Sequence, residues 1–184
     1  YEQLGKNALA ITGVSPALAN QLLNEARAQA KWIGIKHLEI NTFELEKESY
    51  RTNPKDRCFA CKKELHKHTT YLSKKLNYKN VIDGVNFDDL GDFRPGLKAA
   101  QEAGVISPLA IFEFSKKDIR DISKSLGLPW WDKPAQPCLS SRFPYGVEIT
   151  DSRLKMIEKA EEYIRRIGIC LLYTSDAADE HRRV

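Results

Sequence analysis

The sequence has no long apolar run and no leader pattern. No stretch of its 184 residues approaches the roughly 18 consecutive apolar residues that a membrane-spanning helix needs. The opening Tyr1-Glu2-Gln3-Leu4 has no basic segment followed by an apolar one, so a secretory signal is not indicated. We therefore expect a cytoplasmic protein with no membrane partner.

Cysteine is scarce, and neither sign of charge dominates. Four cysteines in a chain of this size do not make a small disulfide scaffold, so reduced thiols or a metal site are expected. The formal net charge is only +4 and the lysines are scattered, which argues against a dedicated nucleic-acid surface. A small anionic ligand fits this charge equally well. The sequence has no internal repeat and no low-complexity segment.

The first 40 residues predict a βαβ unit. Ala8 to Val14 is an apolar run of strand length, and Ser15-Pro16 is predicted to begin a helix as its N-cap and first residue. The apolar spacing continues to Gly34, which is predicted to end this helix, and Ile35 to Ile40 is predicted as a second strand. This order predicts an α/β fold with a parallel sheet.

The rest of the chain predicts more helices, one more strand and a long loop. Cys61 to Leu76 has the spacing of a helix, and Asn80 to Asp83 is predicted as a strand. Shorter helices are predicted at Leu97 to Ala103, from a cap at Ser115 with Asp118 to Gly127, and from a cap at Thr150. Residues 128–146 hold four prolines and four aromatic residues, which excludes a helix or a central strand. A loop of this length is usually functional.

A CxxC unit, Cys58 to Cys61, lies at the start of a predicted helix. Its basic neighbours, which favour thiolates, are Arg57, Lys62 and Lys63. Cys138 is the candidate third ligand, because His66 and His68 are two residues apart on a helix and cannot both face one site. Three thiolates fit a cubane iron–sulfur cluster with one open iron. A structural zinc site with a histidine, or separate buried cysteines, also explains the CxxC unit.

Carboxylates and one arginine gather in Asp83 to Gly96, directly after a predicted strand. This is the edge of a parallel sheet where α/β folds bind ligands. The candidates for binding nucleotide phosphates and Mg²⁺ are Asn86, Asp88, Asp89 and Arg94. A solvated acidic turn, in which an aspartate caps the next helix, explains any single aspartate equally well.

The densest set of candidate catalytic residues lies between Lys133 and Gly146. Cys138 is a candidate nucleophile, and Lys133, Ser141 and Arg142 are suited to an anionic substrate. The alternative is a rigid structural loop with an inert cysteine.

Together these motifs resemble the LarE family of PP-loop pyrophosphatases, the pyridinium-dicarboxylate nucleotide sulfur transferases that build the nickel-pincer cofactor of lactate racemase. The resemblance runs from about Ala8 to Ile169. Its specific segments are Asn53 to Lys62, Asp83 to Gly96, Ser107 to Leu109 and Leu126 to Gly146. It implies a parallel PP-loop sheet with helices on both faces, adenine near Ile11 to Ser15, and a homo-oligomer.

The resemblance also implies an activity. ATP and Mg²⁺ would adenylate a carboxylate of pyridinium-3,5-biscarboxylate mononucleotide, and sulfur would then displace AMP to leave a thiocarboxylate. In single-cysteine members the cysteine that matches Cys138 is a sacrificial donor, which becomes dehydroalanine. Cys58 and Cys61 make this chain similar to the three-cysteine members, in which the thiolates hold a [4Fe-4S] cluster that carries the sulfide.

By the same resemblance the chain divides into four parts. Residues 1–127 are expected to form the ATP pyrophosphatase domain without its first strand and Ser-Gly-Gly-x-Asp-Ser loop, and the fragment alone is expected to be inactive. Residues 128–148 are expected to be the active-site loop, and 149–169 the start of a C-terminal subdomain. Residues 170–184 resemble translated read-through, so Cys170 is excluded from the candidate site.

Two rival functions remain open. A PP-loop tRNA thiolase also joins ATP activation to a three-cysteine cluster, but it predicts a broader basic surface or a zinc ribbon. A noncatalytic zinc-stabilised domain would use Cys58, Cys61 and a histidine. It predicts that Cys138→Ala leaves the metal content unchanged.

Overall fold

A computed structural model describes residues 1–92 and 94–168 of the chain. The predicted read-through at residues 170–184, with Cys170, lies outside the described residues. The described elements, with 3-10 helices marked η, are η1 (Gly5–Asn7), β1 (Leu9–Val14), α1 (Asn20–Ile33), β2 (Lys36–Asn41), η2 (Glu44–Glu46), α2 (Glu48–Arg51), α3 (Arg57–Lys75), η3 (Phe87–Gly91), α4 (Pro95–Glu102), α5 (Pro108–Ile111), α6 (Lys116–Ser125), η4 (Leu139–Arg142) and α7 (Asp151–Arg166).

The chain forms two compact units. The first unit contains Tyr1–Arg57 and the described residues from Pro137 onward, and the second contains Cys58–Gln136. Apart from its first residue, α3 therefore lies in the second unit. The predicted domain boundaries at residues 127 and 148 stay predictions.

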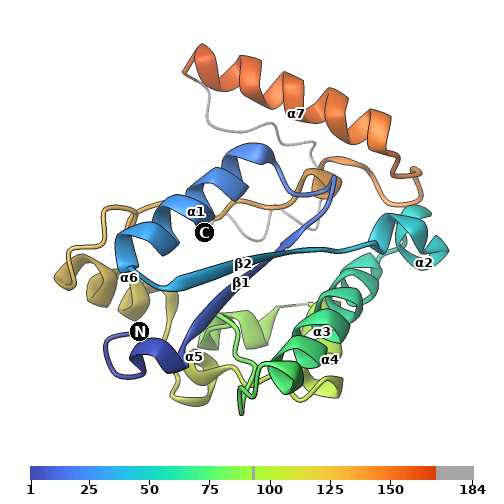
Figure 1. Ribbon diagram of the computed structural model, residues 1–184. Helices are drawn as coiled ribbons and strands as arrows, with labels where there is room; N and C mark the ends of the chain where they lie inside the picture. Colours follow the sequence, from blue (N-terminus) through green and yellow to red (C-terminus); the bar gives the residue numbers. More distant parts are fainter. Residues whose placement is uncertain (93, 169–184) are drawn as a thin grey trace. The chain divides into compact units, whose positions relative to one another are not determined.

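The first unit is built on a parallel βαβ unit, which confirms the predicted α/β class. Strands β1 and β2 pair in parallel from Leu9 opposite Lys36 to Val14 opposite Asn41. Helix α1 connects them and lies alongside the two strands (Figure 1). It ends as predicted at Gly34, whose φ of 79° is left-handed and favours a residue without a β-carbon.

Helix α1 begins four residues later than the predicted start at Pro16. Its N-cap is Ala19, which makes no side-chain cap hydrogen bond. Ser15 instead accepts a hydrogen bond at its Oγ from the Ala17 amide at 3.2 Å, which closes a turn after β1. Ala17 and Ala19 are only 4% and 5% exposed. Burial of these two small side chains explains why the chain turns here before the helix begins.

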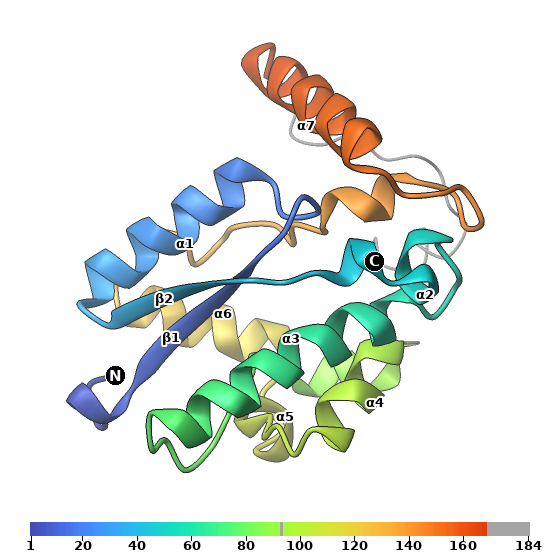
Figure 2. The same ribbon diagram turned by 45° about the vertical axis from the view of Figure 1, so that its right-hand side comes forward.

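Helix α7 also belongs to the first unit. Thr150 caps it, as predicted, by accepting the Arg153 amide at 3.3 Å, and Leu154 on its first turn is completely buried. The Glu158 carboxylate accepts a hydrogen bond from the Asn20 amide at 2.6 Å, and this satisfies a backbone donor at the start of α1. Both ribbon views show α7 beside this end of α1 (Figures 1 and 2).

In the second unit, α4 packs closely against the start of α3 (Figure 2). A β-carbon added to Gly96 would lie 2.9 Å from Cγ of Lys62 and 3.5 Å from the carbonyl oxygen of Cys58. Glycine at residue 96 thus allows the two helices to approach each other.

No described helix is both long enough and apolar enough to cross a membrane.

The predicted strand at Asn80 to Asp83 is wrong in extent. The described backbone forms only an isolated parallel bridge between Ile82 and Ile106, with the Asp83 amide bonded to the Ile106 carbonyl at 3.1 Å. Ile82 is 61% exposed, so its side chain has too little burial to support a longer strand.

The predicted cap of α6 is confirmed, because Ser115 and Asp118 form a reciprocal capping box.

Candidate functional site

Cys138 lies at the carboxyl end of β1, on a turn anchored in the core. It is exposed and directly precedes η4, whereas Leu139 and Ser140 are 1% and 0% exposed. The Leu139 amide donates to the carbonyl of Ala17, in the turn after β1, at 3.0 Å. The carboxyl edge of parallel strands is where α/β folds bind ligands. The turn thus presents a thiol at that edge while its neighbours are held in place.

Ser141 and Arg142 stabilise the turn that carries Cys138. Ser141 Oγ donates to the Cys138 carbonyl at 2.7 Å and accepts from Nη1 of Arg142 at 2.8 Å. Nε of Arg142 donates to Glu161 of α7 at 2.6 Å, and the two side chains are only 4% and 3% exposed. The buried guanidinium and the serine hydroxyl therefore hold the backbone at Cys138.

A second buried contact anchors the same turn from another part of the chain. The Tyr50 hydroxyl lies 2.6 Å from Oγ of Ser140, and both residues are at most 2% exposed. Sequence reasoning missed Tyr50, because a lone tyrosine in a short helix carries no signal of a partner 90 residues away. It also assigned no role to Asn53, which was named only as the first residue of the segment Asn53 to Lys62 that resembles the LarE family.

The CxxC unit lies in the first turns of α3. The helix starts at Arg57, earlier than the predicted Cys61, so Cys58 and Cys61 are three residues apart on one helical face. Cys58 is exposed and Cys61 is partly buried, and within the described part of the chain Cys58, Cys61 and Cys138 form no disulfide. The amino end of a helix carries a partial positive charge that favours thiolates. Cys58 and Cys61 lie in the second unit and Cys138 lies in the first.

The histidines on α3 do not join the CxxC unit. His66 is 4% exposed, and neither ring nitrogen has a hydrogen-bond partner among the described residues. Burial, and secondarily Lys62, lowers the pKa of His66 below its ordinary value of 6.5. His68 lies 3.0 Å from Glu64 through Nε2. In residues 1–92 and 94–168, no three His, Cys, Asp or Glu side chains form a group that could hold a metal ion. The cysteine donors suit an iron–sulfur cluster chemically, but no described group assembles one.

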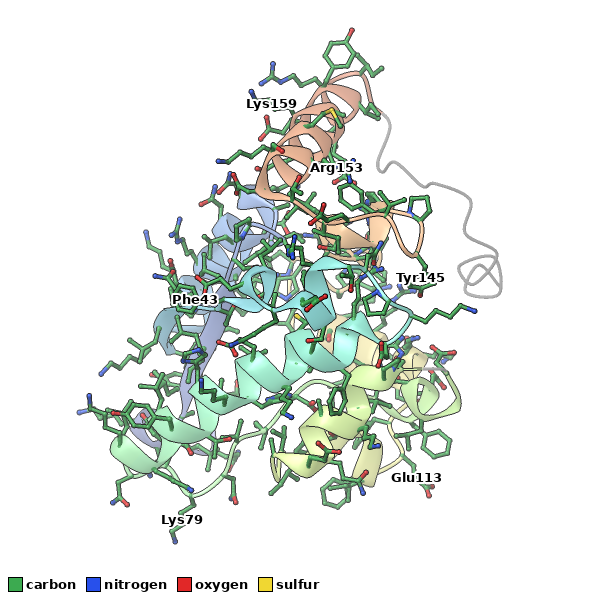
Figure 3. The ribbon with its side chains drawn as sticks, turned by 90° about the vertical axis from the view of Figure 1, so that its right-hand side faces the viewer. Phe43, Lys79, Glu113, Tyr145, Arg153 and Lys159 are labelled. Atoms are coloured by element: carbon green, nitrogen blue, oxygen red, sulfur yellow. The ribbon has the colours of Figure 1, made fainter. Side chains whose placement is uncertain are left out.

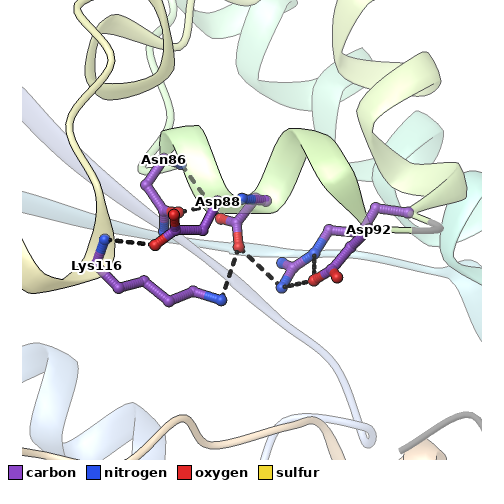
Figure 4. Close-up of polar contacts among 6 residues, drawn as sticks. Asn86, Asp88, Asp92 and Lys116 are labelled. Carbon is purple, nitrogen blue, oxygen red and sulfur yellow. Dashed lines mark hydrogen bonds and ion pairs between the residues drawn. The ribbon is translucent and has the colours of Figure 1, made fainter. Parts of the chain in front are cut away.

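The acidic loop of the second unit is held together by internal contacts (Figure 4). Asn86 and Asp89 form a reciprocal capping box on η3. Asp89 is 5% exposed, and its Oδ1 lies 2.9 Å from Nη2 of Arg94 and 3.3 Å from Nζ of Lys116. Asp88 accepts the Lys116 amide at 2.8 Å, so both aspartates tie η3 to the start of α6.

Two neighbouring groups complete this loop. Asp92 lies 3.2 Å from Nη2 of Arg94, and Asp83 accepts a hydrogen bond from Ser107 Oγ at 2.7 Å. Arg94 keeps 33% of its side chain exposed, which leaves a cation accessible beside the buried Asp89. Lys133, the remaining candidate, lies in the loop after α6 in the second unit.

The parallel βαβ unit, with the Cys138 turn bonded just beyond the carboxyl end of β1, defines an α/β domain, and this is consistent with a PP-loop-like domain. No family model matches the chain. The chain is 56% identical, over 168 residues, to the uncharacterized protein slr1717 of Synechocystis, covering 91% of this chain and 63% of that protein. It is 38% identical, over 133 residues, to the uncharacterized protein MJ0830 of Methanocaldococcus jannaschii, covering 72% and 52%.

A third relative carries a functional name. Over 162 residues the chain is 31% identical to a pyridinium-3,5-bisthiocarboxylic acid mononucleotide synthase of Lactiplantibacillus plantarum, covering 88% of this chain and 59% of that protein. This similarity supports a LarE-like relationship. The chain spans between half and two thirds of the length of these three relatives.

Proposed function

We propose that the full-length protein is an ATP-dependent sulfur transferase that converts a carboxylate of pyridinium-3,5-biscarboxylate mononucleotide into a thiocarboxylate for nickel-pincer cofactor synthesis. The observation that carries the proposal is the exposed Cys138, which precedes the buried Leu139 and Ser140; the Leu139 amide bonds the carbonyl of Ala17 in the turn after β1. The similarity to the synthase of L. plantarum supports the substrate class.

The reaction is proposed in two steps. A substrate carboxylate oxygen attacks the α-phosphorus of ATP, releases pyrophosphate and forms an acyl-adenylate. A sulfur nucleophile then attacks the acyl carbon and releases AMP. When that nucleophile is the Cys138 thiolate, the product is a thioester; loss of the Cys138 α-proton and cleavage of its Cβ–S bond leave the thiocarboxylate and dehydroalanine.

The candidate residues take different proposed roles according to their exposure. Ser141 and Arg142 orient the Cys138 turn, because their polar atoms already bond the turn or Glu161. Arg94, which is partly exposed, and Asp88, which is exposed, would contact the nucleotide or its Mg²⁺, whereas Asn86 and Asp89 order the loop. Lys133 is proposed to contact the adenylate.

The proposal includes a [4Fe-4S] cluster held by Cys58, Cys61 and Cys138. It rests on the donor set: two thiols on one face of α3 and a third exposed thiol. When bound, the cluster would supply a sulfide at its open iron and spare Cys138 from loss. Anaerobic reconstitution with iron and sulfide, followed by iron analysis of Cys→Ala variants at 58, 61 and 138, tests this part alone.

Sulfur transfer is tested with the full-length protein, ATP, Mg²⁺ and pyridinium-3,5-biscarboxylate mononucleotide, with the product identified by mass spectrometry. The expected result is a thiocarboxylate product that Cys138→Ser abolishes. The mass of the protein after reaction distinguishes the donors, because a sacrificial Cys138 loses the elements of H₂S and a cluster donor leaves the protein unchanged. Absence of the product with intact protein rejects the proposal.

The same experiment separates the rival functions. A tRNA thiolase would leave the pyridinium substrate unreacted and would incorporate sulfur into tRNA. A noncatalytic zinc-stabilised domain would bind zinc with Cys138→Ala and consume no ATP.

A further inference from the structure

The loop that follows Cys138 is held by one buried asparagine. Asn53 lies between α2 and α3 and is 0% exposed. Its Nδ2 donates to the carbonyl of Pro144 at 2.8 Å and to that of Phe143 at 3.4 Å. The backbone carbonyl of Asn53 accepts a hydrogen bond from the Gly146 amide at 2.9 Å. Asn53 thus bonds three positions of a loop that is 90 residues away in the sequence.

The other side of the same amide holds Arg57. Oδ1 of Asn53 accepts a hydrogen bond from Nη1 of Arg57 at 2.5 Å, and Arg57 is only 6% exposed. The Arg57 guanidinium also lies 5.4 Å from the ring centre of Tyr145, which Figure 3 shows in the loop leading to Arg153. Asn53 therefore connects the loop that follows Cys138 to the residue that directly precedes Cys58.

The backbone of Asn53 is in an uncommon conformation. Its φ of 54° is left-handed, a region that asparagine tolerates better than most residues but that still costs free energy. The conformation is retained because the Asn53 amide bonds the Tyr50 carbonyl at 3.0 Å while the Tyr50 hydroxyl contacts Ser140. Conformations of this kind persist where surrounding contacts over-determine them, often at functional sites.

We propose that Asn53 is a positioning residue for Cys138. Its amide fixes the loop after η4, and so sets the direction in which the Cys138 thiol is presented. The inference rests on the proposed sulfur transfer for its chemical consequence. An amide is needed because it donates to two carbonyls and accepts from a guanidinium at once.

Two substitutions distinguish the loss of the whole Asn53 side chain from the loss of its hydrogen-bond donor alone. Asn53→Gly keeps the left-handed backbone available and removes all three side-chain hydrogen bonds, to Phe143, Pro144 and Arg57. Asn53→Asp keeps an acceptor for Arg57 but has no donor for the carbonyls of Phe143 and Pro144. Asn77→Gly is the matched control, since Asn77 is also left-handed, with a φ of 59°, but is exposed in the turn after α3.

Amide hydrogen exchange on the full-length protein tests the positioning without any substrate. In both Asn53 variants, exchange in residues 139–147 is expected to accelerate about tenfold or more, while β1 and α1 keep their rates. Asn77→Gly is expected to leave residues 139–147 unchanged. A uniform acceleration throughout the first unit, or no acceleration in the loop, overturns the proposal.

The chemical consequence is tested on the two partial reactions. ATP–pyrophosphate exchange, which reports adenylation, is expected to stay within about twofold of the parent, whereas thiocarboxylate formation falls about tenfold. Equal loss of both reactions indicates a merely structural role and overturns the proposal. A parent protein that forms no thiocarboxylate contradicts the proposed function instead, and the hydrogen-exchange result then decides the inference.

Discussion

Arg142 of η4 and Glu161 of α7 form a buried ion pair, with Nε 2.6 Å from Oε1 and both side chains less than 5% exposed. Through Ser141, this pair reaches the carbonyl of Cys138. A helix later in the chain thereby stabilises the turn that carries the candidate nucleophile.

The ion pair predicts a large cost when one charge is removed. Glu161→Gln leaves the Arg142 guanidinium buried without its counter-charge, so the free energy of unfolding is expected to fall by about 3–5 kcal/mol. Urea denaturation followed by circular dichroism measures it. Glu162→Gln, at the adjacent exposed position, is the control and is expected to change stability by less than about 0.5 kcal/mol. Equal effects of the two variants would contradict the prediction.

The Tyr50–Ser140 contact predicts a coupled pair. Tyr50→Phe removes one hydroxyl and leaves Oγ of Ser140 buried without that partner, at an expected cost of about 1–3 kcal/mol. Ser140→Ala in the Tyr50→Phe background is expected to recover part of this loss, because neither side chain then requires a hydrogen bond. A double-mutant cycle measures the coupling, and strictly additive effects would show that the two hydroxyls do not interact.

The close approach of α3 and α4 predicts that Gly96→Ala destabilises the protein. The new methyl group would lie 2.9 Å from Cγ of Lys62, an atom near the base of that side chain, so the helices must shift. The expected loss is about 1–3 kcal/mol, measured by thermal or urea unfolding. Gly91→Ala is the control, because nothing lies within 4 Å of its added carbon. Gly96→Ala with stability equal to this control would disprove the close packing.

Buried His66 predicts a pH dependence of stability. Burial lowers its pKa below 6.5 in the folded protein, so as the pH falls below 6.5 the unfolded chain takes up a proton that the folded protein resists. This contribution to stability is present above pH 6.5 and is lost as the pH falls from there toward the folded-state pKa. His66→Leu is expected to flatten the dependence of Tm on pH in this window.

His68→Gln, a change at a 31% exposed histidine of the same helix, is the control for that experiment. It is expected to retain the pH dependence of the parent. An unchanged pH profile in His66→Leu would show that the buried imidazole does not oppose protonation.

Several elements followed from local sequence. The end of α1 at Gly34, the Ser115–Asp118 capping box and the Thr150 cap were predicted correctly. Each depends on backbone groups within a few residues of the side chain that signals it. The late start of α1 at Asn20 was missed, because burial of Ala17 and Ala19 decides it and a pattern of residue types does not show burial.

For the candidate site, too, some features followed from the sequence and others only from the structure. Residue chemistry pointed to Cys138, and its proposed role awaits the sulfur-transfer test. The sequence did not reveal that Arg142 is buried against Glu161 or that Asn53 holds the loop at Phe143, since these contacts join residues 19 and 90 positions apart. Residue type and spacing specify hydrogen-bonding capacity and helical period, whereas packing of the folded chain specifies which distant partner satisfies each buried polar group.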